Sequence, residues 1–178
     1  MALLGSLRKM KEKYFLGVFG DGSELERAKK FAEKNGINAQ FFGNVKHNEM
    51  LAKMREYDLV AMMSYDYDTQ GLTIDEAEAT SVPVLLVDKN LTENLPEGGY
   101  ALVGGVGGGG VDEIAGKGGS GELGDPNAGV MAGELGGFSV SAVAGDFCAG
   151  REPASEEEVA AALDELAREP ERLVKMRE

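Results

Sequence analysis

The segment SYDYDTQGLTIDEAEATSVPVLLVD places acidic residues and a glycine between two apolar runs. Gly71 stands where a helix is expected to begin, so the backbone amides of Leu72 and Thr73 would face any anion in front of them, such as a diphosphate. Asp68 precedes this turn, and Glu76 lies about one turn further along the helix. A carboxylate can accept two hydrogen bonds from vicinal hydroxyls. The spacing therefore suits a ligand with sugars on both sides of a diphosphate.

A second interpretation of the same segment needs no ligand. Asp75, Glu76 and Glu78 are also compatible with a solvated helix face, because acidic residues in a first turn interact favourably with the helix dipole. The residues alone leave both interpretations open.

Another candidate turn lies in GVFGDGSELER, where an apolar run meets Gly20 and Gly22 before a helical pattern. Glycine allows the backbone to approach a ligand closely, and the first helical turn favours an anion. The dinucleotide-binding fingerprint would need a third glycine where Leu25 stands, and the next strand ends without the acid that would hold a ribose. NAD binding is therefore disfavoured.

His47, in the segment FFGNVKHNEML, is the only histidine of the chain. It could donate to a phosphate or to a sugar hydroxyl near the end of a strand. The simpler interpretation, which we favour, is a loop histidine close to a helix that Asn48 caps.

The elements that must position these residues alternate in period between residues 14 and 88. Four short apolar runs predict strands buried on both faces, and they cover residues 14–20, 39–43, 58–64 and 82–88. Helical patterns lie between them: the first is capped by Ser23 and ended by Gly36, the second is capped by Asn48, and the third begins near Gly71.

Strands and helices in strict alternation predict an α/β fold, with an open, mostly parallel, Rossmann-like sheet and helices on both faces. Ligands of such sheets bind at the carboxyl ends of the strands. The acidic segment follows the third strand directly, so we expect it at that edge.

We expect a single α/β domain over residues 1–178, with a glycine-rich insertion at 104–150 and closing helices at 155–178. The insertion holds 17 of the 26 glycines, and ordering so flexible a backbone costs much conformational entropy. We expect it to be loosely structured, with FSVSAVAG as its one plausible strand. In the closing helices, Ser155 and Glu158 form a capping-box pattern and Pro170 starts a second helix.

Composition excludes several classes of protein. The formal charge is −13, and residues 61–178 hold 7 basic against 23 acidic side chains, which argues against a nucleic-acid surface. With Cys148 as the only cysteine and a single histidine, the chain can form neither an internal disulfide nor a Cys/His metal cage. No apolar run approaches the length of a membrane span, and the first residues lack the long apolar core of a secretory signal, so we expect the protein in the cytoplasm.

Three motifs occur in order: Gly-Asp-Gly after a strand, Phe-x-Gly-x-Val before a helix, and an acid eight positions ahead of Glu76. In this respect residues 19–88, together with the closing helices, resemble the carboxyl-terminal, donor-binding half of group-1 (family 4) glycosyltransferases of the GT-B fold. The resemblance implies that the intact enzyme transfers a hexose from a UDP- or GDP-sugar, with retention and without a metal ion, to an acceptor that the sequence does not identify.

The resemblance also implies a role for each motif. Asp68, where glutamate is commoner in the family, would hold the donor sugar, and Glu76 the ribose. It further implies that the amides near Gly71 and Leu72 bind the diphosphate and that the backbone of Asn44 and Val45 contacts the base. Gly20 and Gly22 would form an early turn.

Two departures from the family pattern favour a rival interpretation. The Arg-Lys pair that clamps the diphosphate in the family has no convincing counterpart, since Arg8 and Lys13 have the spacing but Lys13 abuts the first strand. The 178 residues also contain no counterpart of the amino-terminal, acceptor-binding half. The alternative is a non-catalytic α/β binding module, or a fragment that lacks its acceptor half. A receiver-like or flavin-binding protein is a weaker alternative.

Overall fold

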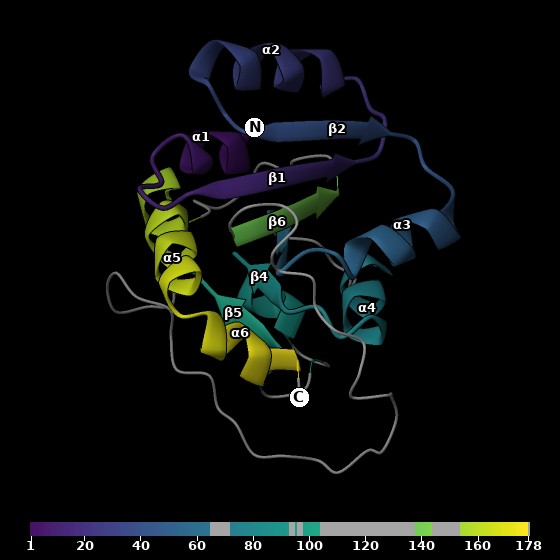
Figure 1. The fold of residues 1–178 in the computed structure, drawn as a ribbon, viewed down its shortest axis with the longest axis vertical. Coiled ribbons are helices and arrows are strands. Elements are labelled where there is room, and N and C mark those ends of the chain that lie inside the picture. Colours follow the sequence, from purple (N-terminus) through teal and green to yellow (C-terminus); the bar gives the residue numbers. More distant parts are fainter. Residues whose placement is uncertain (65–71, 93–94, 96–97, 104–137, 144–153, 178) are drawn as a thin grey trace.

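A computed structural model describes residues 1–64, 72–92, 95, 98–103, 138–143 and 154–177 (Figure 1). Within these residues, six parallel strands form one open sheet in the order β2-β1-β6-β3-β4-β5. The strands are β1 (Tyr14–Phe19), β2 (Ala39–Gly43), β3 (Leu59–Met62), β4 (Val84–Leu86), β5 (Tyr100–Leu102) and β6 (Phe138–Val143). The helices are α1 (Ala2–Leu7), α2 (Leu25–Asn35), α3 (His47–Met54), α4 (Leu72–Ala79), the short 3-10 helix η1 (Lys89–Thr92), α5 (Glu156–Arg168) and α6 (Pro170–Arg177). The predicted α/β class with a parallel sheet is confirmed.

Each face of the sheet carries its own hydrophobic core. One core packs alternate strand residues, such as Leu16, Leu59 and Val140, against side chains of α1, α2, α5 and α6. The other packs the intervening residues, such as Val60 and Leu86, against α3 and α4. Successive strand side chains point to opposite faces, so continuous apolar runs are what a sheet covered on both sides requires. Helices on both faces are therefore confirmed.

Strand β2 departs from the expectation of burial on both faces. It lies at the edge of the sheet, and none of its residues is fully buried. An edge strand has a neighbour on one side only, so its side chains lose less contact with water than those of an interior strand.

Strand β6 comes late in the sequence but lies in the interior of the sheet, between β1 and β3. The Asp58 carboxylate, just before β3, accepts hydrogen bonds from the Ser139 hydroxyl at 2.7 Å and the Ser139 amide at 2.8 Å. In return, the Asp58 amide donates to the Ser139 carbonyl at 3.1 Å. The predicted strand in FSVSAVAG is confirmed, whereas the rest of the glycine-rich insertion lies outside the described residues.

Two predicted helix caps are wrong. Helix α2 has Glu24, not Ser23, at its N-cap, and no side-chain hydrogen bond caps it; the Gly22 carbonyl accepts the Leu25 amide at 3.0 Å. Helix α3 begins at His47, with an extended Lys46 at the N-cap in place of the predicted Asn48. In both cases the N-cap is a residue outside the preferred capping types, so the local capping signal did not decide where the helix starts.

The other predicted helix ends are confirmed. Gly36 ends α2 in the left-handed conformation at φ 65°, which glycine adopts without steric cost. Ser155 and Glu158 form a reciprocal capping box at the start of α5, and Pro170 opens α6. Helix α1 and strand β5 lie in segments for which the sequence pattern gave no prediction.

Candidate functional site

The candidate site lies at the carboxyl edge of the sheet, where the direction of the chain connections changes. The chain runs from β1 outward to β2 on one side, and from β3 through β4 to β5 on the other, with β6 between. The crevice at such a switch point is the usual ligand site of open α/β sheets. The ends of β2 and β3 are three strand spacings apart, about 14 Å at ~4.8 Å per spacing. An extended ligand can therefore lie along the edge and meet several strand ends.

The turns after β1 and β2 are joined by backbone hydrogen bonding. The Gly20 amide donates to the Gly43 carbonyl at 2.8 Å. Both residues have positive φ, 110° for Gly20 and 66° for Gly43, so these turns use conformations that favour glycine. At Gly22 a β-carbon would meet no protein atom within 4 Å, so packing within the described residues does not require glycine there. Asn44 is exposed and Val45 is half-buried just beyond β2.

The orientation of helix α4 is set by two of its residues, Ile74 and Ala77, which are fully buried against the sheet. Residues three or four positions apart on a helix lie on the same face, so Thr73 and Glu76 share the flank beside this buried stripe. Both are half-buried, whereas Leu72 at the first position is 76% exposed. The amides of the first turn thus begin at an exposed end of the helix.

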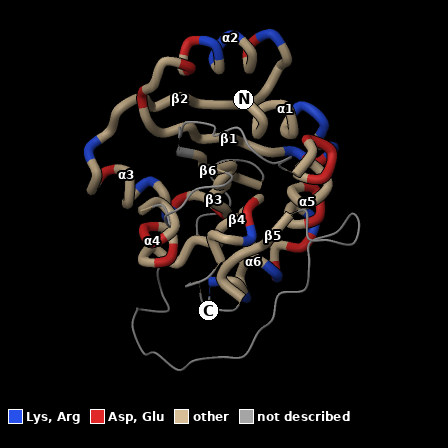
Figure 2. Tube along the Cα trace, turned by 180° about the vertical axis from the view of Figure 1, so that it is seen from behind, with Lys and Arg blue, Asp and Glu red and all other residues tan. Residues whose placement is uncertain are grey.

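The acids of α4 are not equivalent, although they are close in sequence. Asp75 and Glu78 are exposed, as the solvated-face interpretation requires. The side chain of Glu76 is only 20% exposed and turns toward α3, which Figures 1 and 2 both show beside α4. The structure therefore separates Glu76 from its two acidic neighbours. Asp68 and Gly71, also predicted for this site, lie outside the described residues.

The structure brings His47 and Glu76 together, which the sequence interpretation did not predict. The Nδ1 atom of His47 lies 3.4 Å from the Oε1 atom of Glu76. His47 is the first helical residue of α3 and not a loop residue, so the prediction of a loop histidine is wrong. The signal was present in the sequence: the apolar stripe of Met50, Leu51 and Met54, extended back by one turn, reaches His47.

Aromatic side chains support the strand ends below the site. Phe19, at the end of β1, stacks on Phe42 with ring centroids 4.7 Å apart, and the Tyr57 ring meets Phe19 edge-on at 5.8 Å. The Lys53 ammonium lies 4.9 Å from the centre of the Phe42 ring. Tyr57 is 3% exposed, and burial raises the pKa of its phenol to about 12. The rings couple β1, β2 and the segment before β3 into one packed unit.

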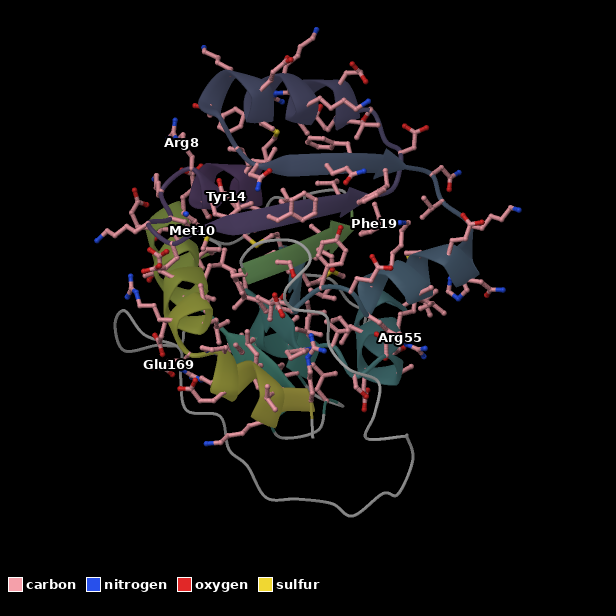
Figure 3. The ribbon with its side chains drawn as sticks, in the orientation of Figure 1. Arg8, Met10, Tyr14, Phe19, Arg55 and Glu169 are labelled. Carbon is pink, nitrogen blue, oxygen red and sulfur yellow. The ribbon has the colours of Figure 1, made fainter. Side chains whose placement is uncertain are left out.

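Arg8 and Lys13, which have the spacing of the family's diphosphate clamp, lie at the wrong edge of the sheet. Figure 3 labels Arg8 and Tyr14 at the start of β1 and Phe19 at its other end. Lys13 immediately precedes β1, so the length of that strand separates it from Gly20, about 20 Å at ~3.3 Å per residue. Neither residue is placed to neutralise a diphosphate at the carboxyl edge.

In the part of the chain that the structure describes, no group of three or more His, Cys, Asp or Glu side chains is arranged to hold a metal ion. Nor is any helix there long and apolar enough to cross a bilayer.

The sheet, its switch point and the acid-bearing helix after β3 define an α/β protein with an open parallel sheet, a class whose ligands bind at the carboxyl edge of the sheet. Residues 2–95, more than half of the chain, match the family described as "Glycosyl transferases group 1". The chain belongs to this family, and the matched region is the carboxyl-terminal, donor-binding half of its GT-B fold. Membership implies a transferase domain that takes a sugar donor. No curated protein and no solved structure matches the chain significantly.

Proposed function

We propose that this chain binds a nucleotide diphosphate sugar along the carboxyl edge of its sheet and serves as the donor half for retaining hexose transfer to an acceptor not yet identified. The observation that carries the proposal is the position of Glu76 on α4. It is the half-buried acid of the helix, one turn from the exposed amino end, at the edge where the turns after β1 and β2 also lie.

The proposed division of roles follows the order of the strand ends. The backbone at Asn44 and Val45, beyond β2, takes the base, and the turn at Gly20 and Gly22 leaves room for the ligand beside it. Glu76 accepts hydrogen bonds from the ribose hydroxyls, because an ionised carboxylate is purely an acceptor with two oxygens. These positions put the nucleoside between α3 and α4.

The diphosphate and the sugar complete the arrangement toward β3. The amides of Leu72 and Thr73, with that of Gly71, face the diphosphate, where the helix dipole contributes about 0.3–1 kcal/mol. Asp68 holds the donor sugar. The proposal needs no metal ion, because fixed amides and dipoles can balance charge that develops on a leaving group.

A binding experiment with a matched control tests this function. Uridine and guanosine diphosphates, and their hexose conjugates, are titrated into the labelled protein while the amide resonances of Asn44, Leu72, Thr73 and Glu76 are followed. A charge-assisted hydrogen bond contributes about 1.5–3 kcal/mol, so Glu76→Gln should weaken binding roughly 10- to 150-fold. Glu78→Gln makes the same chemical change on the exposed face of the same helix and should alter the Kd less than about twofold.

Two outcomes would overturn the proposal. One is the absence of any shift at these amides with millimolar ligand, and the other is an equal loss of affinity in the two glutamine variants. The retaining course is checked separately, by determining which anomer of the hexose is released or transferred. Release of the inverted anomer would exclude retention while leaving donor binding intact.

A second candidate function, donor binding without turnover, is favoured by the position of Arg8 and Lys13 at the opposite edge. If Arg8 and Lys13 supply no cationic clamp, the leaving diphosphate has less to stabilise its developing charge. The positive side chains closest in sequence to the ends of β2 and β4 are Lys46 and Lys89, and both are exposed. Saturable binding of the donor with no release of free nucleotide diphosphate over hours would identify this second function.

A further inference from the structure

The geometry around Glu76 points to a role for His47 in the same site. Helix α3 begins directly after the turn at Asn44 and Val45, and His47 is its first residue. Residues three, four and seven positions later on the same face are Met50, Leu51 and Met54, of which Met54 is buried and Met50 packs against the core shared with α4. The apolar stripe fixes the rotation of α3 and thereby directs His47 toward α4.

His47 contacts Glu76, the acid to which the proposed function assigns the ribose hydroxyls. His47 Nδ1 lies 3.4 Å from Glu76 Oε1, between side chains that are 61% and 20% exposed. Among the described residues, His47 makes the ion-pair contact to the Glu76 carboxylate, while Asp75 and Glu78 are exposed on the other flank of the helix. An N–H at Nδ1 can donate to one carboxylate oxygen, which leaves the other oxygen free to accept from a ligand.

We infer that His47 is a positioning residue for nucleotide binding: it holds the Glu76 carboxylate in the rotamer that accepts the ribose hydroxyls. The inference rests on the proposed function. A free glutamate side chain loses rotamer entropy when it binds, and a neighbour that fixes it in advance removes part of that cost. Because His47 follows Val45 by two residues, the same short segment provides the proposed base contacts and orients the ribose acceptor.

The role makes a prediction that a purely structural contact does not share. If His47 acts through Glu76, its removal should reduce the ability of the protein to distinguish a ribose from a deoxyribose. A contact that only joins α3 to α4 would instead lower the stability or weaken all nucleotides equally.

The experiment measures the dissociation constants of uridine and guanosine diphosphates and of their 2′-deoxy forms, by calorimetry. The wild-type protein should bind the ribonucleotide at least about tenfold more tightly than its deoxy form, since a lost charge-assisted bond costs that much. His47→Ala should lower this ratio at least threefold. His47→Asn, whose amide nitrogen can replace Nδ1 as a donor, should retain most of the ratio. Asn48→Ala, at the exposed next residue of α3, is the matched control and should leave the ratio unchanged.

The outcomes separate this inference from the function on which it depends. If the wild-type protein prefers the ribonucleotide and His47→Ala keeps the full ratio, the role of His47 is overturned while donor binding stands. If the wild-type protein binds neither nucleotide, or binds both forms equally, the proposed roles of Glu76 and His47 are both refuted. Thermal unfolding of each variant shows whether it is folded, and His47→Asn provides the comparison if His47→Ala is not.

Discussion

Replacing Gly17 by alanine tests whether the aromatic packing below the site is as rigid as its geometry indicates. A β-carbon at Gly17 would lie 2.1 Å from the hydroxyl oxygen of Tyr57, 2.4 Å from Cζ and 2.7 Å from Cε1. Carbon atoms at their optimal separation are about 3.5–4.0 Å apart, so the overlap exceeds an ångström. The Tyr57 ring is 3% exposed and lies against Phe19 and Phe15, so it cannot simply swing into solvent.

The expected magnitude follows from two opposing terms. Overpacking a closed core costs about 1–3 kcal/mol, whereas replacing a glycine within a strand by alanine gains about 0.5–1 kcal/mol. Gly17→Ala should therefore lower the free energy of unfolding by roughly 1–2 kcal/mol in the wild-type background. Tyr57→Leu removes all three obstructing atoms, and in that background Gly17→Ala should raise the free energy of unfolding by up to about 1 kcal/mol.

Urea unfolding of the four proteins, followed by circular dichroism, measures this cycle. The change of sign between the two backgrounds corresponds to a coupling of about 1–3 kcal/mol, well above the usual error of a few tenths. An equal effect of Gly17→Ala with and without the tyrosine ring would refute the reasoning. The slope of the unfolding free energy against urea should stay constant, so that the midpoints report stability alone.

Two further predictions concern a second glycine and the tyrosine phenol. At Gly5 in α1 a β-carbon would meet Glu156 Oε1 at 1.9 Å, but this carboxylate is the 40%-exposed end of a flexible side chain. Gly5→Ala should therefore cost nothing or stabilise the protein by up to about 1 kcal/mol in the same urea assay, and a loss above about 1 kcal/mol would contradict this view. Burial raises the pKa of Tyr57 to about 12 from the ordinary value of 10 for tyrosine, so the unfolded chain loses this proton first as the pH rises. Stability should be unaffected by this group below about pH 10 and should fall between about pH 10 and 12, by at most roughly 2–3 kcal/mol; Tyr57→Phe should show a correspondingly smaller fall, and an identical pH profile would refute the assignment.

Local sequence patterns were sufficient to predict the features whose physical cause lies among neighbouring residues. The apolar runs of β1, β3 and β4 predict strands because both faces of each are buried, and Gly36 ends α2 because its left-handed conformation carries no steric cost for glycine. The capping box of Ser155 and Glu158 needs only residues three apart. Such features depend on near neighbours, so a single sequence contains them.

The two wrong helix caps occurred where a residue of a preferred capping type was not used as the N-cap in the folded chain. Ser23 and Asn48 are both good capping residues, yet the Gly22 carbonyl bonds the first amide of α2, and α3 starts one residue before Asn48. The shift of α3 is small, but it moves His47 from a loop onto a helix face. The predicted start of α3 was two residues too late, and this boundary error concealed a contact in the candidate site.

The sequence by itself determined the class of fold, the alternation of strand and helix, and the acidic helix start after β3. Each of these follows from hydrophobic periodicity and residue spacing within a short stretch of sequence. Only the tertiary structure decided that β6 enters the sheet between β1 and β3, and that Glu76 among the acids of α4 turns toward His47. The physical reason is that strand order and helix rotation depend on which distant surfaces are buried together. The hydrogen bonds between Asp58 and Ser139 join residues 81 positions apart, and no local pattern specifies such a partner.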